Sequence, residues 1–160
     1  MAFCFDYYFK IIMVKNILRI FKPDFSFSNL TDIDPDIFKG AQLIIFDVDG
    51  TLFFSETAET SEEIIGWFKK INDQYKCVCL SNSRTIFNRK EKISELLNCE
   101  IFLSKHRKPF KKLFKEIKKR YNFENDKVFI IGDKILIDVL FGNLNGTKTI
   151  LVKSLGRNGI

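Results

Sequence analysis

Short apolar runs alternate along this chain with longer segments whose apolar residues recur at helical spacing. The clearest run, Leu43 to Phe46, is continuously apolar and leads directly into Asp47. Continuous runs of this kind are typical of parallel strands that helices cover on both faces. We therefore expect a buried parallel strand over residues 42–47.

The remaining patterns predict strands and helices in alternation. Strands are expected at 76–81, 100–103, 127–131 and 148–152, and helices from the capping-box pattern Thr60-x-x-Glu63, over 84–97, from Pro109 onward and over 134–143. A short helical turn is expected at 34–40, with Asp34 as its cap and Gly40 at its end. This alternation predicts an α/β fold with a doubly wound, five-stranded parallel sheet and right-handed crossovers.

The N-terminal residues differ from the rest of the chain. Residues 1–28 are expected to form an apolar extension and residues 29–160 a single folded domain, because a chain of 160 residues suffices for one core. The segment Met1–Phe21 is interrupted by charges and lacks a small-residue cleavage site, which argues against a spanning helix or a signal peptide. An amphipathic segment that lies on a membrane surface is an alternative interpretation.

The composition is that of a globular protein, with 46% apolar and 29% charged residues. The formal net charge of +6 favours an acidic or phosphorylated substrate. None of the four cysteines forms a Cys-x-x-Cys pair, and Cys77 and Cys79 alternate within an expected strand, where they point to the same face. We expect reduced, inert thiols and a cytoplasmic protein, or one that is peripheral at a membrane.

Polar side chains suited to phosphate chemistry follow the predicted strands. They are Asp47 and Asp49 after the first, Ser81 and Asn82 after the second, Lys108 beyond the third, and Asp133 with Asp138 after the fourth. Because parallel strands end at one edge of a sheet, we expect these groups to meet there. Two close carboxylates repel each other and need a cation, for which Mg²⁺ with its oxygen ligands is suited.

These residues resemble the four ordered motifs of the haloacid dehalogenase (HAD) superfamily of phosphatases. Asp47-Val48-Asp49-Gly50-Thr51 matches the first motif, Ser81 the second, Lys108 the third, and Gly132-Asp133 with Asp138 the fourth. Arg107-Lys108-Pro109 and Gly142-Asn143-x-Asn145-Gly146 are similar to the YqeG-type group of the capless subclass IIIA phosphatases. That group is related to mitochondrial phosphatidylglycerophosphate phosphatases. The resemblance implies a Rossmann-like HAD core without a cap domain.

The resemblance also implies a role for each residue. Asp47 would attack phosphorus and form an aspartyl-phosphate, and Asp49 would act as general acid and base. Mg²⁺ would be held by Asp47, the Asp49 carbonyl and Asp133, while Ser81, Asn82 and Lys108 bind phosphate oxygens. Thr51 and Asp138 would support these groups from behind. Lys105 and Arg107 compete with Lys108 for the phosphate-facing role, and His106 is expected to be solvated.

The spacing between motifs bears on the substrate. Neither the gap from Thr51 to Ser81 nor that from Ser81 to Lys108 holds a separate cap, since even a small domain needs about 50 residues. The resulting open site suits a phosphate on a lipid headgroup, with phosphatidylglycerophosphate as the leading candidate, on a nucleic-acid end or on a protein.

Two other classes of function are weighed against this one. A signalling receiver is disfavoured, because the expected third strand ends in Ser104 rather than in a phospho-accepting Asp. A non-catalytic module that binds nucleic acid or the ribosome rests on the lysine-rich run 111–120 alone, which is also explained as the solvated face of a helix. The oligomeric state is not indicated.

Overall fold

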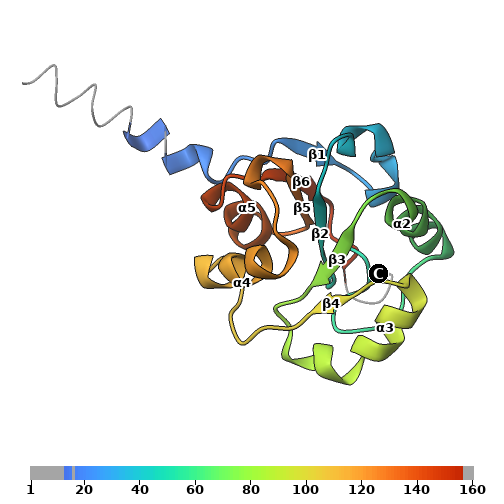
Figure 1. Cartoon of the computed structure of the whole chain (residues 1–160). Coiled ribbons are helices and arrows are strands. Elements are labelled where there is room, and N and C mark those ends of the chain that lie inside the picture. Colours follow the sequence, from blue (N-terminus) through green and yellow to red (C-terminus); the bar gives the residue numbers. More distant parts are fainter. Residues whose placement is uncertain (1–12, 16, 157–160) are drawn as a thin grey trace, which may run out of the picture.

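A six-stranded parallel sheet forms the centre of the structure, a computed structural model that describes residues 13–15 and 17–156 (Figure 1). The strands are β1 Phe25–Phe27, β2 Leu43–Asp47, β3 Cys77–Leu80, β4 Ile101–Phe102, β5 Val128–Gly132 and β6 Lys148–Val152. They lie in the order β1-β6-β5-β2-β3-β4, and every pairing is parallel. The predicted doubly wound α/β fold is confirmed.

The strand count was predicted one too low. The additional strand, β1, lies within residues 1–28, so part of that segment belongs to the sheet. β1 has only three residues and is mostly exposed, which leaves no apolar run to detect. It is held at the edge of β6, where the Asp24 carboxylate accepts a hydrogen bond from the Thr149 amide at 2.7 Å.

Helices cover both faces of the sheet, with α2 and α3 on one side and α4 and α5 on the other (Figure 1). The helices are α2 Glu62–Gln74, α3 Lys90–Leu97, α4 Lys111–Tyr121 and α5 Leu140–Leu144, with 3₁₀ turns η1 Leu30–Asp32, η2 Pro35–Phe38, η3 Arg84–Asn88 and η4 Asn125–Lys127 and a π turn η5 Ile135–Val139. Along β2, Ile44 and Phe46 pack toward the first pair and Leu43 and Ile45 toward the second. This alternation explains why the run is apolar throughout.

The helix starts differ in part from the sequence-based expectations. The turn at 34–40 is confirmed: the Asp34 side chain accepts from the Asp36 amide, and Gly40 has a φ of 84°. The capping box at Thr60 is wrong, because Ser61 caps α2 by accepting from the Ile64 amide at 3.2 Å.

One expected helix is interrupted, one begins with a π turn, and a third begins later than expected. Segment 84–97 divides at Arg89 into η3 and α3. The helix expected over 134–143 is observed, with the π turn η5 running directly into α5. Pro109 does not open a helix, because α4 begins at Lys111 after Phe110.

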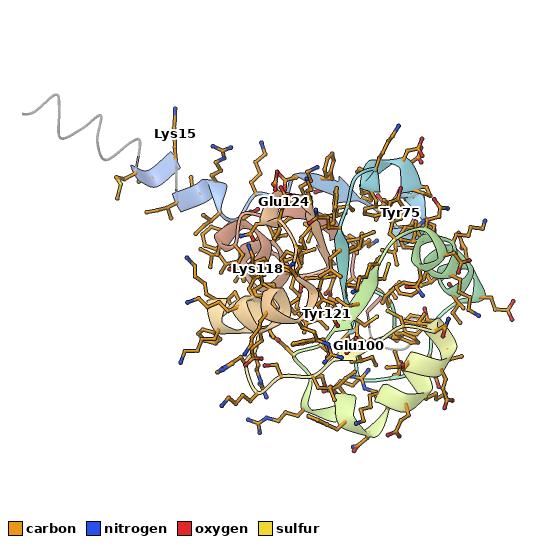
Figure 2. The ribbon with its side chains drawn as sticks, viewed as in Figure 1. Lys15, Tyr75, Glu100, Lys118, Tyr121 and Glu124 are labelled. Atoms are coloured by element: carbon orange, nitrogen blue, oxygen red, sulfur yellow. The ribbon has the colours of Figure 1, made fainter. Side chains whose placement is uncertain are left out.

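A side-chain hydrogen bond links two segments that are distant in the sequence. The Tyr121 hydroxyl at the end of α4 donates to Glu100, just before β4, at 2.8 Å (Figure 2). Cys77 and Cys79 share one core face, as predicted, and burial raises the pKa of the Cys77 thiol. Among the described residues, no helix is long and apolar enough to cross a membrane.

Candidate active site

The predicted site residues converge where the strands end. Asp47 is the last residue of β2, and Asp133 and Asp138 follow β5, its neighbour in the sheet. Carboxylate oxygens of these three residues lie within 4.8 Å of one another. The expected convergence of carboxylates at one edge of the sheet is therefore observed.

A buried lysine links two of the carboxylates. The Lys108 ammonium lies 2.5 Å from Asp47 and 2.5 Å from Asp138, and its side chain is only 1% exposed. Lys105 and Arg107 are exposed, so of these three cations it is Lys108 that is buried against Asp47 and Asp138. With two carboxylates around one ammonium, this inner group carries a net negative charge when both carboxylates are ionised.

Burial and charge oppose each other in this cluster. Burial raises the pKa of Asp47 to about 7, although the nearby Lys108 works to lower it. Burial lowers the pKa of Lys108, but Asp138 and Asp47 outweigh that effect and hold it above its usual value. Lys108 thus keeps its charge at neutral pH, and additional positive charge near Asp47 would favour its carboxylate form.

Asn82 and Gly132 set the position of the lysine. The Asn82 side-chain amide donates to the Lys108 carbonyl at 2.8 Å and accepts from the Lys108 amide at 2.9 Å. The Asn82 side chain therefore orients the Lys108 backbone, a contact that sequence reasoning did not anticipate. A Cβ on Gly132 would lie 2.2 Å from Cγ of Asp138, so glycine is required for Asp138 to reach Lys108.

Asp49 accepts hydrogen bonds from three directions. Its carboxylate receives the Ser81 hydroxyl and an Arg89 guanidinium nitrogen, each at 2.6 Å, and the Glu56 amide at 2.8 Å. Ser81 therefore lies beside Asp49, and its oxygen also accepts from the Ser83 amide at 2.9 Å. Both carboxylate oxygens are fixed by these donors.

Arg89 is the residue that sequence reasoning missed. It lies three positions after Ile86 and four before Ile93, both of which are buried. A charged residue on the apolar stripe of an amphipathic segment was therefore a signal in the sequence.

The oxygen atoms around Asp133 suit a hard cation. The Lys134 ammonium lies 2.8 Å from the Asp133 carboxylate and 3.2 Å from the Asp49 carbonyl. A carboxylate and a carbonyl thus already converge on one positive charge. With Asp47 beside them, these are the ligand types that Mg²⁺ takes. One Asp138 oxygen accepts from the Lys108 ammonium and the other from the Lys134 amide. Asp138 therefore holds the Lys108 side chain in place.

The other candidates lie at the margin of the site. The Thr51 hydroxyl donates to Asp47 over 3.4 Å, a long contact. His106 is separate from the carboxylates of the site, and its Nε2 atom lies 3.5 Å from the Glu116 carboxylate. The site opens into a pocket of about 490 Å³, and Arg84 and Arg107 are among the residues that line it.

Comparisons with known proteins identify the family of the chain. Residues 106–158 match the family model described as HAD-hydrolase-like. The chain is 33% identical over 137 residues to the probable phosphatase YqeG of Bacillus subtilis, covering 84% of this chain and 78% of that protein.

Two solved structures also have some similarity. The core domain of a proposed phosphoglycolate phosphatase from Streptococcus pneumoniae is 20% identical with a TM-score of 0.48, covering 74% of this chain and 87% of that one. A hypothetical protein from Xanthomonas campestris is 18% identical with a TM-score of 0.48, covering 79% and 72%. The sequence match to YqeG extends over most of both chains, and it decides the assignment. The chain therefore belongs to the HAD superfamily, as a phosphatase related to YqeG.

Proposed function

We propose that this protein is a Mg²⁺-dependent phosphomonoester hydrolase that forms an aspartyl-phosphate on Asp47. The observation that carries the proposal is the buried Asp47 carboxylate at the end of β2, with the Lys108 ammonium 2.5 Å away. A fixed cation beside the nucleophile offsets the charge of an approaching phosphate dianion. The arrangement thus suits in-line attack on phosphorus.

The proposed reaction consists of two displacements at phosphorus. In the first, an Asp47 oxygen bonds to phosphorus, the bond to the ester oxygen breaks, and Asp49 gives that oxygen its proton. In the second, Asp49 takes a proton from water, whose oxygen bonds to phosphorus while the bond to Asp47 breaks. Inorganic phosphate leaves, and both carboxyl groups return to their initial states.

The surrounding residues would hold the transferring group. Ser81 and Lys108 would bind phosphate oxygens, and Asn82 contributes by fixing the Lys108 backbone. Thr51 supports Asp47. The carboxylates of Asp47 and Asp133 and the Asp49 carbonyl would hold Mg²⁺, which when bound neutralises charge on the phosphate oxygens.

The surface around the site favours a large amphipathic substrate. Exposed apolar side chains occur in the segments that follow β3, β4 and β5, on the edge of the sheet where the site lies; they are Phe87, Leu103, Phe110, Ile135 and Leu136. Exposed cations accompany them, and Arg84 and Arg107 line both the catalytic pocket and the adjoining groove. Apolar and cationic groups together suit a lipid phosphate in an anionic bilayer, so phosphatidylglycerophosphate is the proposed substrate.

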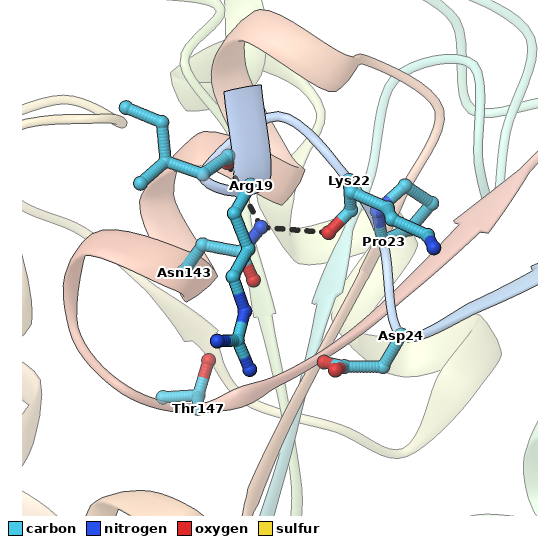
Figure 3. A pocket seen from close by; sticks show the side chains of 7 residues that line it. Arg19, Lys22, Pro23, Asp24, Asn143 and Thr147 are labelled. Carbon is cyan, nitrogen blue, oxygen red and sulfur yellow. Dashed lines mark hydrogen bonds between the residues drawn. The ribbon is translucent and has the colours of Figure 1, made fainter. Parts of the chain in front are cut away.

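The N-terminal segment lies far from the active site, at the end of the sheet where the strands begin. The Asn143 side-chain amide donates to the carbonyls of Ile20 and Lys22 at 2.8 and 2.9 Å, in a pocket that also includes Thr147, just before β6 (Figure 3). The active site lies at the other end of the sheet, where the strands finish. The proposed peripheral membrane contact therefore involves the rim of the active site rather than the helical residues 13–15 and 17–19.

Phosphate release from an aryl phosphate tests the chemistry. Wild-type protein should release phosphate with Mg²⁺ and not with EDTA, and Asp47→Asn should abolish release. Release that persists in Asp47→Asn would remove Asp47 as the nucleophile.

The substrate is tested separately with vesicles that contain phosphatidylglycerophosphate. We expect faster hydrolysis there than of a phosphopeptide or a 5′-phosphorylated RNA, and Phe87→Ser with Leu136→Ser should slow only the vesicle reaction. Leu18→Ser, at the opposite end of the sheet, is the control. Preference for the peptide or the RNA would replace the lipid assignment, and salt-sensitive RNA binding without turnover would indicate a non-catalytic module.

A further inference from the structure

Arg89 connects the catalytic motif to the loop that follows it. One guanidinium nitrogen donates to the Asp49 carboxylate at 2.6 Å, and the other terminal nitrogen donates to the Thr57 carbonyl at 2.6 Å. Thr57 belongs to the loop between Asp49 and α2, and the Glu56 amide of that loop also donates to Asp49, at 2.8 Å. A single side chain thus holds both the carboxylate and the loop.

The backbone places Arg89 for these contacts. Arg89 lies at the junction of η3 and α3 with φ −131° and ψ −1°, outside both helices. Its residue is only 9% exposed, and its Nε atom has no hydrogen-bond partner. Burying a guanidinium costs desolvation free energy, and buried ion pairs of this kind add little to stability compared with apolar packing. A purely structural role therefore accounts poorly for it.

The contacts determine how the Asp49 carboxylate is oriented. Oδ1 accepts from Arg89 and from the Glu56 amide, and Oδ2 accepts from Ser81 at 2.6 Å. Of these three donors, only Arg89 is charged, and it comes from the junction of η3 and α3. Without it, each carboxylate oxygen would keep one neutral donor, and the carboxylate would be held less firmly.

We infer that Arg89 is a positioning residue for proton transfer by Asp49, an inference that rests on the proposed phosphatase reaction. In that reaction the ester oxygen leaves phosphorus with the bonding electron pair and receives its proton from Asp49. A poor leaving group such as an alkoxide depends on that proton, whereas a dinitrophenolate leaves without it. Replacing Arg89 should therefore lower kcat more for a substrate whose leaving group needs an acid.

The experiment compares glycerol phosphate with dinitrophenyl phosphate for wild type, Arg89→Met and Arg89→Lys. Arg89→Met should lower kcat for glycerol phosphate on the order of 10²-fold, with little change for dinitrophenyl phosphate. Arg89→Lys, which keeps a charge but not both contacts, should restore part of the loss. Arg120→Met is the matched control, since Arg120 pairs with Glu100 on the exposed surface.

Several outcomes would overturn the inference. Equal losses for both substrates in Arg89→Met and Arg89→Lys would indicate a structural role, as would an unchanged kcat for both. If Arg89→Met does not fold, as judged by thermal unfolding, Arg89→Lys carries the comparison. In an Asp49→Asn background, replacing Arg89 should no longer change the ratio of the two kcat values, and a persistent change would assign Arg89 another partner. Wild-type protein that hydrolyses neither ester would instead refute the proposed function.

Discussion

The Lys108 ammonium and the Asp138 carboxylate, thirty positions apart in the chain, are joined at 2.5 Å inside the site, and both side chains are 1% exposed. Asp138 therefore sets where Lys108 points, and Lys108 in turn meets Asp47 at 2.5 Å. Two carboxylates share one buried cation. When both carboxylates are ionised, this arrangement leaves one negative charge for a second cation to balance.

Removal of Lys108 should destabilise the protein in a pH-dependent way. Lys108→Met leaves two buried carboxylates without their cation, which we expect to cost about 3 kcal/mol in the free energy of unfolding. Burial already raises the pKa of Asp47 to about 7, and loss of Lys108 would raise it further. A group whose pKa is raised by folding contributes stability at low pH that is lost as pH rises through the folded pKa.

The deficit of Lys108→Met relative to wild type should therefore be larger at pH 8.5 than at pH 5.5. Urea unfolding at both pH values, without Mg²⁺, measures it. The exposed Lys111→Met is the control. A deficit that shrinks as pH rises would contradict the expected direction of the pH dependence.

Asp138 should affect turnover through Lys108. Asp138→Asn removes one negative charge from the pair, so Lys108 is held less firmly toward Asp47. We expect kcat to fall about 10- to 100-fold, the range found when groups that orient catalytic ligands are replaced. Steady-state kinetics on an aryl phosphate measure the change. A kcat equal to that of wild type would show that Lys108 keeps its place without Asp138.

The sequence predicts those site residues that lie at the ends of buried strands. Asp47 and Asp133 each come at the end of an apolar run that is explained only as a buried strand. Because these two strands pair in parallel, the two residues lie at the same end of the sheet. The choice of Lys108 over Lys105 and Arg107 could not be made in that way. It depends on which side chain turns inward, and Asn82 decides this through two hydrogen bonds to the Lys108 backbone.

A broken helix explains why the position of Arg89 was not predicted. The pattern over 84–97 fits a continuous helix with Arg89 on its apolar stripe, and that pattern names no partner for the charge. In the structure the helix breaks at Arg89, and the side chain is buried against Asp49. β1 was missed for another reason: its pairing with β6 is a tertiary contact, and three residues carry no periodicity.

Two glycines offer a matched test of close packing. Gly132→Ala places a Cβ 2.2 Å from Cγ of Asp138, which must move away from Lys108. We expect loss of most phosphatase activity and about 2 kcal/mol of destabilisation. Gly66→Ala in α2 meets no atom within 4 Å and should stabilise by about 1 kcal/mol, since alanine favours helices. Thermal unfolding and activity distinguish them; similar effects would contradict the packing described.

Lys134 should compete with the divalent cation. Its ammonium lies 2.8 Å from the Asp133 carboxylate, one of the proposed metal ligands. Lys134→Gln removes that positive charge, so the Mg²⁺ concentration for half-maximal activity should fall several-fold. Titration of activity with Mg²⁺ measures it, with Lys153→Gln as the control. A higher Mg²⁺ requirement in Lys134→Gln would mean that the lysine assists the site instead.

Chemical trapping shows whether Asp47 is the nucleophile. Borohydride reduces an acyl phosphate to an alcohol, so protein quenched during turnover should carry homoserine in place of Asp47. Peptide mass mapping locates the change, and Asp47→Asn protein serves as the blank. We expect reduction at Asp47 that requires both substrate and Mg²⁺. Reduction at Asp49, or none at all while phosphate is being released, would contradict it.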